Sequence, residues 1–122
     1  PVWHWDYNEY IGRVVIPESV DYNGITYSVT SIGDDAFRGC SSLTSVVIPN
    51  SVTSIGQYAF QSCQAATTVT IGSSVTQIGE DALWSCDSLA TIIVNRNNQY
   101  YTSDEYGVLF NKDKTDNNTK GE

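Results

Sequence analysis

A sequence repeat of 23 residues constrains this chain more than any other feature. Three successive segments begin at Ser28, Ser51 and Ser74, and most of their columns match at that one offset. A unit of this length is too short to bury its own apolar face, so the units must stack and share one continuous core. The matching columns are Val29/Val52/Val75, Ile32/Ile55/Ile78, Gly33/Gly56/Gly79, Ala36/Ala59/Ala82, Phe37/Phe60/Leu83, Cys40/Cys63/Cys86, Leu43/Ala66/Leu89, Val46/Val69/Ile92 and Ile48/Ile71/Val94.

Each unit predicts one strand and one connection to the next strand. Its apolar positions Val46 and Ile48 are spaced by two, which is the alternation of a strand. The glycine after Ile32 lets the chain turn, and the residues that follow are long enough for one helical turn that lays Ala36 and Phe37 onto the core. We therefore expect a β-rich repeat solenoid, a short right-handed coil with parallel strands and one helical turn per rung.

The composition agrees with strands. The chain has 12 Val and 10 Ile but only 4 Leu and no Met, together with 12 Thr and 14 Ser. β-branched residues suit a pleated surface, whereas Leu and Met favour helices. The 122 residues are enough for a single core.

The segments on both sides of the three units predict flanking β-hairpins. A partial unit begins at Ile11, and Asn23-Gly24 is a strong signal for a hairpin over residues 20–29. After the repeats, two short β-rich runs precede a polar end that we expect to be disordered. The expected organisation is an N-terminal strand, first partial rung and hairpin cap at 1–27, three repeats at 28–96, a hairpin-like flank at 97–114 and a disordered tail at 115–122.

The net charge argues against two classes of partner. The chain has 6 Lys and Arg against 14 Asp and Glu, a formal charge of −8. This charge repels phosphate backbones and anionic head groups, so we expect no nucleic-acid partner. No apolar run approaches the roughly 18 residues that a membrane helix needs, so we expect no membrane insertion.

The three cysteines occupy one column, with one cysteine in each unit. Stacked rungs would place them about 4.8 Å apart, with parallel side chains that do not point at one another as a disulfide requires. No Cys-x-x-Cys spacing or partner histidine supports zinc. We predict buried thiols that act as small apolar core residues.

Two acidic pairs raise the question of a calcium site. Asp34-Asp35 and Glu80-Asp81 fall in equivalent positions two rungs apart, and Gln57-Tyr58 lies between them. A separation of about 10 Å is too large for one ion whose ligands lie at about 2.4 Å. We therefore expect no metal site, and we interpret these carboxylates as solvated charges.

Catalysis finds little support in the sequence. The one histidine, His4, lies between Trp3 and Trp5 and outside the repeats. No nucleophile elbow or glycine-rich phosphate loop occurs. We expect no enzyme activity, no catalytic residue and no cofactor.

Alternation along the strands predicts which residues face outward. If Val46 and Ile48 point into the core, the residues between them point to solvent. Val15, Val47 and Ile93 make one outward row more apolar than solubility favours, which suggests a ligand-binding surface, although β-branched residues also simply pave exposed sheets. The two predicted rows are Arg13/Ser45/Thr68/Thr91 and Val15/Val47/Thr70/Ile93.

Trp3, Trp5 and Tyr7 alternate with polar residues and predict a strand with an aromatic face. Such a strand could cap the exposed end of the solenoid, since an open end leaves core and strand edges uncovered. It could also dock on a neighbouring chain and give head-to-tail assembly, or stack on a ligand such as a sugar.

With these columns identified, the run from Val14 to Phe60 resembles the BspA-type leucine-rich repeats of bacterial and protist surface proteins. The shared pattern is I-x-x-x-A-F-x-x-C-x-x-L-x-x-I-x-I-P-x-S-V-x-x-I-G, and the likeness covers about residues 11–115. Departures that we expect to weaken a rung are Ala66 for Leu, Leu83 for Phe, and Gly72 and Asn95 for Pro. The resemblance implies surface display, secretion, adhesion and protein binding, and no catalytic residue.

These observations predict a non-catalytic extracellular or cell-surface interaction module. Its rigid sheet would bind a protein ligand on another cell or in the matrix. The alternative is a self-assembling filament or coat subunit that associates through the N-terminal aromatic strand and the solenoid ends.

Overall fold

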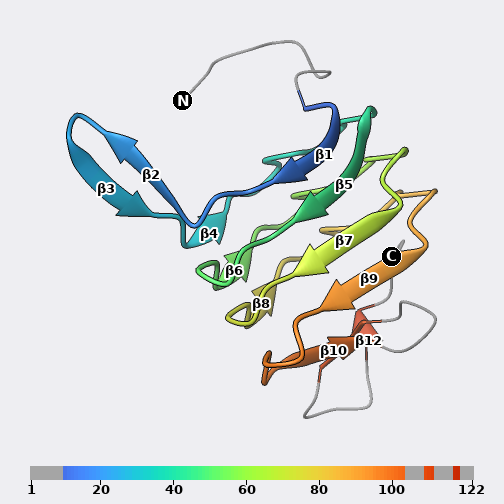
Figure 1. Ribbon diagram of the computed structural model, residues 1–122. Helices are drawn as coiled ribbons and strands as arrows, with labels where there is room; N and C mark the ends of the chain where they lie inside the picture. Colours follow the sequence, from blue (N-terminus) through green and yellow to red (C-terminus); the bar gives the residue numbers. More distant parts are fainter. Residues whose placement is uncertain (1–9, 104–108, 112–116, 119–122) are drawn as a thin grey trace.

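The computed structural model describes residues 10–103, 109–111 and 117–118, which form a coil of stacked rungs (Figure 1). One strand of each rung lies in a parallel sheet of order β1-β5-β7-β9. Val46, Val69 and Ile92 lie in register and point into the core, so the predicted parallel stacking is confirmed. These strands are β1 (Gly12–Val15), β5 (Leu43–Val47), β7 (Thr68–Ile71) and β9 (Thr91–Val94).

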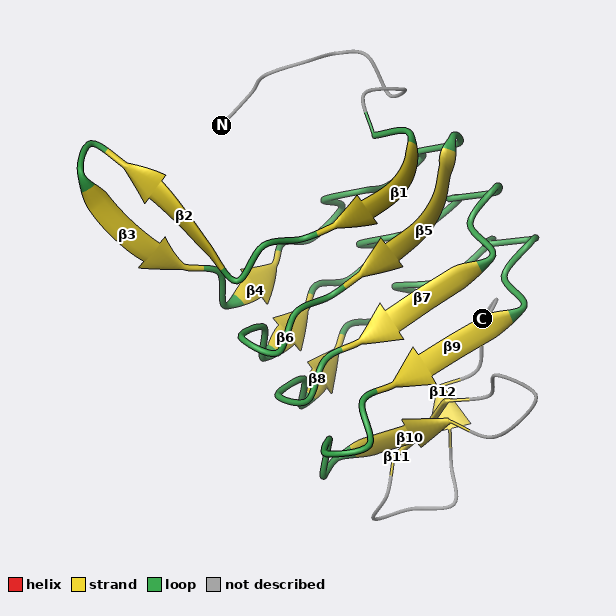
Figure 2. Ribbon diagram, in the orientation of Figure 1, coloured by secondary structure: helices red, strands yellow, loops and turns green. Residues whose placement is uncertain are grey.

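A second parallel sheet, of order β4-β6-β8, lies across the core from the first (Figure 2). Ile32, Ile55 and Ile78 stack in register along it, and their side chains help to close the apolar interior. Its strands are β4 (Ser31–Ile32), β6 (Ser54–Ile55) and β8 (Gln77–Ile78). None of the described residues forms a helix, and thus none forms one that could span a membrane.

The expected helical turn in each rung is wrong, because consecutive tight turns take its place. An α-helix needs bonds from each N–H to the carbonyl four residues earlier. Here the Ala36 N–H donates to the Gly33 carbonyl at 3.2 Å, three residues back, and Asp35 has a positive φ of 61°. The Phe37 N–H donates instead to the Ala59 carbonyl of the next rung at 2.7 Å. Bonds between rungs thus replace bonds within a helix.

The core consists of the apolar columns that the repeat predicts. Phe37 and Phe60 stack in adjacent rungs, with ring centroids 5.1 Å apart and planes 6° from parallel. Ala59 and Ala82 are buried, but Ala36 is exposed, so its expected burial is wrong. Among the described residues Ala36 has a neighbouring turn on one side only, whereas Ala59 lies between two.

The glycine column makes close rung stacking possible, and turning is not its main purpose. None of Gly33, Gly56 and Gly79 has a positive φ. A Cβ on Gly56 would lie 2.5 Å from the Asp34 nitrogen, and one on Gly79 would lie 2.6 Å from the Gly56 carbonyl carbon. These distances leave no room for a side chain. Gly33, which begins the column, has open space at the same position.

The two ends of the coil differ. At the first rung the hairpin predicted over 20–29 is present as β2 (Ser19–Tyr22) and β3 (Ile25–Ser28), and it projects away from the rungs (Figure 1). At the last rung β10 (Tyr101–Ser103), β11 (Leu109–Asn111) and β12 (Asn117–Asn118) form an antiparallel sheet. β12 puts two residues of the expected disordered tail into a strand.

Asn98 fixes the start of this C-terminal structure. It is 1% exposed, and its Nδ2 donates to the carbonyls of Gly72 at 2.9 Å and Val75 at 3.0 Å. Its Oδ1 accepts bonds from the N–H groups of Tyr100 and Tyr101 at 2.8 and 2.7 Å. One buried amide therefore joins the last rung to the segment that leads into β10.

Candidate functional site

The outward rows of the main sheet lie where alternation predicts them. Cross-strand register joins Arg13 to Ser45, Thr68 and Thr91, and Val15 to Val47, Thr70 and Ile93. The members in the outermost strands β1 and β9 are exposed, and those in β5 and β7 are half-buried. A role in binding stays a prediction for all eight residues.

The structure separates the two rows by shape. Val15, Val47, Thr70 and Ile93 line a groove of about 570 Å³ at the carboxyl ends of the sheet strands. The row that begins at Arg13 does not line it. We call this feature the sheet-end groove. Its remaining lining residues are Ile16, Pro17, Glu18, Ile48, Pro49, Asn50, Ile71, Gly72 and Asn95.

The floor of the sheet-end groove depends on two departures from the repeat pattern. Gly72 and Asn95 occupy the column of Pro17 and Pro49. A Cβ on Gly72 would lie 2.6 Å from the Pro49 carbonyl carbon, so only glycine permits the observed approach of these rungs. The missing side chain of Gly72 thus lets the two rungs pack this closely, and the expected weakening of the rung stays a prediction.

A polar ladder along the rim of the groove was not predicted from the sequence. Asn50 Oδ1 accepts a bond from the Ser73 N–H at 2.8 Å and lies 3.5 Å from Asn95 Nδ2. Asn95 Oδ1 in turn accepts a bond from the Asn97 N–H at 2.8 Å. The sequence signal for this ladder is the pair of asparagines at adjacent columns, Asn50 directly after Pro49 and Asn95 in the Pro column. These amides hold the rim in place beside the apolar floor.

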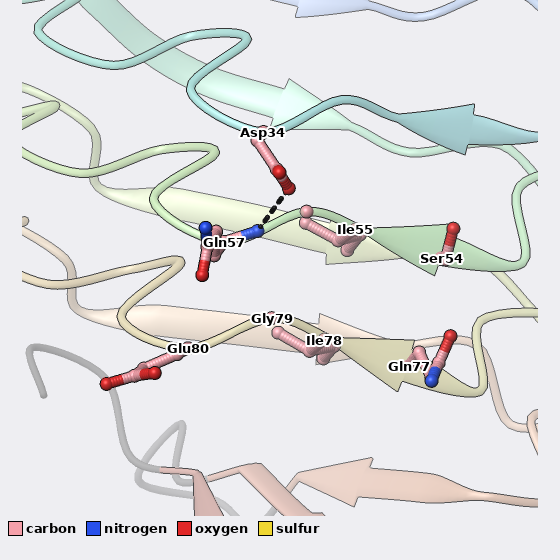
Figure 3. A pocket seen from close by; sticks show the side chains of 9 residues that line it. Asp34, Ser54, Ile55, Gln57, Gln77, Ile78, Gly79 and Glu80 are labelled. Carbon is pink, nitrogen blue, oxygen red and sulfur yellow. Dashed lines mark hydrogen bonds between the residues drawn. The ribbon is translucent and has the colours of Figure 1, made fainter.

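The acidic pair positions border a second hollow, on the β4-β6-β8 sheet (Figure 3). Asp34, Gln57 and Glu80 occupy one column of it, and its volume is about 410 Å³. Asp34 Oδ1 accepts a bond from the Gln57 N–H at 2.9 Å, whereas Glu80 points away. In the described ranges, no three His, Cys, Asp or Glu side chains group so that they could hold a metal ion. The Asp34 carboxylate thus serves to join two rungs.

The cysteine column is buried in the core, and its members are thiols, as predicted. Cys63 Sγ donates to the Phe37 carbonyl and Cys86 Sγ to the Phe60 carbonyl, both at 3.0 Å. The hydrogen bond with Cys86, and then burial, raise the pKa of the Cys63 thiol well above its usual range. All three thiols are buried, which limits the access of reactants to them, so this column has a packing role.

The N-terminal aromatic strand lies outside the described residues, and with it Trp3, Trp5, Tyr7 and His4. The first described residue, Tyr10, packs its ring edge against Phe37 with centroids 4.9 Å apart. The predicted capping, assembly and ligand-stacking roles of the aromatic strand therefore stay predictions.

Comparison with solved structures gives two similar leucine-rich repeat proteins of Bacteroides. The one from Bacteroides capillosus is 40% identical with a TM-score of 0.64, and the match covers 70% of this chain and 62% of that one. The one from Bacteroides ovatus is 34% identical, also at 0.64, and covers 70% of this chain but 24% of that one. The chain thus spans only part of either relative.

A more distant likeness extends over more of the chain. The pneumococcal vaccine antigen PcpA is 15% identical with a TM-score of 0.50, over 92% of this chain and 47% of that one. At this identity the match concerns the fold alone. A search of curated proteins gives no significant match.

A family model gives the most specific comparison. The model described as "BspA type Leucine rich repeat region" matches residues 10–108 in six copies. These residues include every rung of the main sheet and the hairpin between β1 and β4. The chain therefore belongs to the family of BspA-type leucine-rich repeat proteins.

Proposed function

We propose that this chain is a non-catalytic protein-interaction module that binds a protein ligand in its sheet-end groove. The observation that carries the proposal is the row Val15, Val47, Thr70 and Ile93, which lines a single apolar groove across four parallel strands. A contiguous exposed apolar surface with polar residues at its rim is a mark of interaction sites.

The groove is preorganised for binding. Backbone bonds between rungs fix its floor, for example from the Ile48 N–H to the Thr70 carbonyl at 2.8 Å. Val15 is 57% exposed and Ile93 is 47% exposed, so both still have apolar area to bury against a partner. A rigid surface loses little conformational entropy on association, which favours affinity.

The groove is poorly equipped for catalysis. Among the described residues that line it, Glu18 is the one titratable side chain, and the lining includes no Ser–His or Cys–His pair. General acid–base or nucleophilic chemistry needs such partners within hydrogen-bond reach. The same lining suits recognition, because apolar contacts dominate and the Asn50 and Asn95 amides supply orientation.

Display at the cell surface or outside the cell forms part of this proposal. Membership of the BspA-type family supports it, since that resemblance implies surface proteins that contact other cells or the matrix. A ligand on another cell or in the matrix fits this location. A direct check is to label intact cells of the source organism with an antibody raised against the chain.

The groove is tested by adding charge to its floor. The chain is first screened against an immobilised panel of extracellular-matrix and cell-surface proteins, and any binder is measured with the double variant Val47→Lys, Thr70→Lys. We expect affinity to fall at least about tenfold, since two lysines would have to be desolvated in an apolar contact. Gln57→Lys, Gln77→Lys is the control, because both glutamines are exposed on the opposite side of the coil, Gln77 in β8 and Gln57 in the turn after β6. Equal affinity of the groove variant and the wild type, with an unchanged melting temperature, would exclude this surface.

Self-assembly is the second candidate, and the position of β1 supports it. Among the described residues β1 is the outermost strand of its sheet, and Ile11 beside it is 67% exposed. Unpaired edges are sites for strand addition from another chain. Deletion of residues 1–8 should then leave a stable monomer where the full chain forms oligomers. A full chain that sediments only as a monomer at high concentration would exclude this function.

A further inference from the structure

The β2–β3 hairpin has an amphipathic pattern that its own fold does not use. Its register places Val20 opposite Tyr27 and Tyr22 opposite Ile25, so these four side chains share one face. The other face is polar, and on it the Thr26 hydroxyl donates to Asp21 Oδ1 at 2.6 Å. An apolar hairpin face normally packs against a core.

This apolar face is exposed. Tyr22 is 63%, Ile25 54%, and Val20 and Tyr27 each 48% exposed. Figure 1 shows the hairpin standing clear of the stacked rungs. Four large apolar side chains on one exposed arm exceed what scattered surface residues explain.

Neither edge of the hairpin is paired with another strand in the part of the chain that the structure describes, because β2 and β3 pair there only with each other. In a hairpin with a two-residue turn, the backbone groups of alternate residues point away from the partner strand. Here those are the groups of Ser19 and Asp21 on β2 and of Thr26 and Ser28 on β3. They can pair with an extended segment in the manner of β-augmentation.

The carboxylates near the hairpin favour a partner segment that carries positive charge. The hairpin and the residues beside it, 14–33, contain Glu18 and Asp21 and no Lys, Arg or His. A second copy of this chain, with its charge of −8, would add like charge at the contact. A cationic segment would be attracted, and its ammonium or guanidinium groups could also lie over Tyr22 or Tyr27.

We propose that the β2–β3 hairpin is a docking arm that takes up an extended segment of another protein, rich in Val or Ile alternating with Lys or Arg, as a third strand. The apolar residues of the segment cover the face of Tyr22 and Ile25, and its basic residues meet the local carboxylates. Glu18 also lines the sheet-end groove, whereas Asp21, Tyr22 and Ile25 do not, so variants at these three residues test the hairpin alone.

The probe is a blocked eight-residue peptide of alternating valine and lysine, titrated into the full ¹⁵N-labelled chain. We expect amide shifts concentrated in residues 19–28 and an affinity at least about tenfold higher than for alternating valine and glutamate or for alternating serine and lysine. Raising the salt from 50 to 300 mM should weaken binding about threefold, because exposed charges are screened.

Variants tie the binding to the hairpin face. Tyr22→Thr, Ile25→Thr keeps strand-forming residues but removes the apolar surface, and it should lower affinity at least about tenfold. Ile93→Thr, a similarly exposed position in the groove, should change it less than about twofold. Asp21→Asn preserves shape and removes a charge at a residue that does not line the sheet-end groove, and it should weaken binding even if the hairpin of the first variant unfolds.

Three outcomes would overturn the proposal. The first is the absence of shifts in residues 19–28 at millimolar peptide. The second is equal binding of the valine–glutamate peptide. The third is concentration-dependent sedimentation of the chain alone that Tyr22→Thr, Ile25→Thr abolishes, because a second copy would then be the occupant. Loss of panel binding in the groove variant with retained peptide binding would separate the two sites.

Discussion

The central rungs and the β2–β3 hairpin are both β-structure, but they are stabilised in different ways. In the rungs, Val52 and Val75 are fully buried, and each rung bonds to the next through backbone groups. In the hairpin every residue is exposed, and the two strands are held by their own ladder and the Asn23-Gly24 turn. Burial in the rungs thus supplies the stability of the fold, whereas the apolar side chains of the hairpin stay exposed to solvent.

The largest expected difference between the two regions comes from removing one aromatic ring from each. Phe60→Ala should lower the free energy of unfolding by about 3 to 5 kcal/mol, since the ring is 2% exposed and stacks on Phe37. Tyr22→Ala should cost less than about 1 kcal/mol. Urea denaturation followed by circular dichroism measures both. Similar costs would show that the hairpin is part of the cooperative core.

A second comparison concerns the last rung, which the polar side chain of Asn98 joins to the segment that leads into β10. Asn98→Leu keeps the volume but leaves the carbonyls of Gly72 and Val75 without their amide donor, and it should cost about 3 kcal/mol. Asn97→Leu, at the exposed neighbour, should change stability by less than about 0.5 kcal/mol. Thermal unfolding measures the melting temperature of both variants. Equal melting temperatures would show that the Asn98 amide does not stabilise the last rung.

The smallest expected effect lies within the glycine column itself. Gly79→Ala forces a Cβ against the backbone of the preceding rung and should cost about 2 kcal/mol. Gly33→Ala meets no atom within 4 Å and should stay within about 0.5 kcal/mol of wild type. Chemical denaturation of the two variants measures their free energies of unfolding, and the difference separates the effect of close rung packing from that of turn flexibility. If both variants lose the same stability, the column serves the turn after all.

The sequence predicts what repeats and misses what depends on neighbours in space. The columns through Val46 and Ile48 predict strand register because apolar alternation is local and recurs at one period. The helical turn is absent because the Phe37 N–H bonds to a residue 22 positions later, which no local propensity reports.

The candidate site shows the same division. Alternation predicts the row Val15, Val47, Thr70 and Ile93, and the structure finds it in one groove. The groove also needs the close approach of Gly72 to Pro49, which only the packed rungs reveal. Asn98 lies one period after Val75, in the column of Val29, Val52 and Val75, so the repeat predicts a buried residue there but an apolar one, and the joining role of its amide is not visible in the column.

The bonds between rungs have a consequence for how such chains change length. Thr53 donates to the Thr30 carbonyl and Thr76 to the Thr53 carbonyl, both at 2.9 Å and both over the same 23 residues. Because each rung donates and accepts these backbone bonds at the same positions, removing residues 51–73 would join Asn50 to Ser74 and keep the backbone bonds between rungs in phase. Side-chain partners would change, since Asn95 would then meet Pro49 in place of Gly72 and Leu83 would meet Phe37 in place of Phe60. Gain or loss of a whole unit thus preserves the strand register, whereas a single-codon insertion shifts all later columns out of phase.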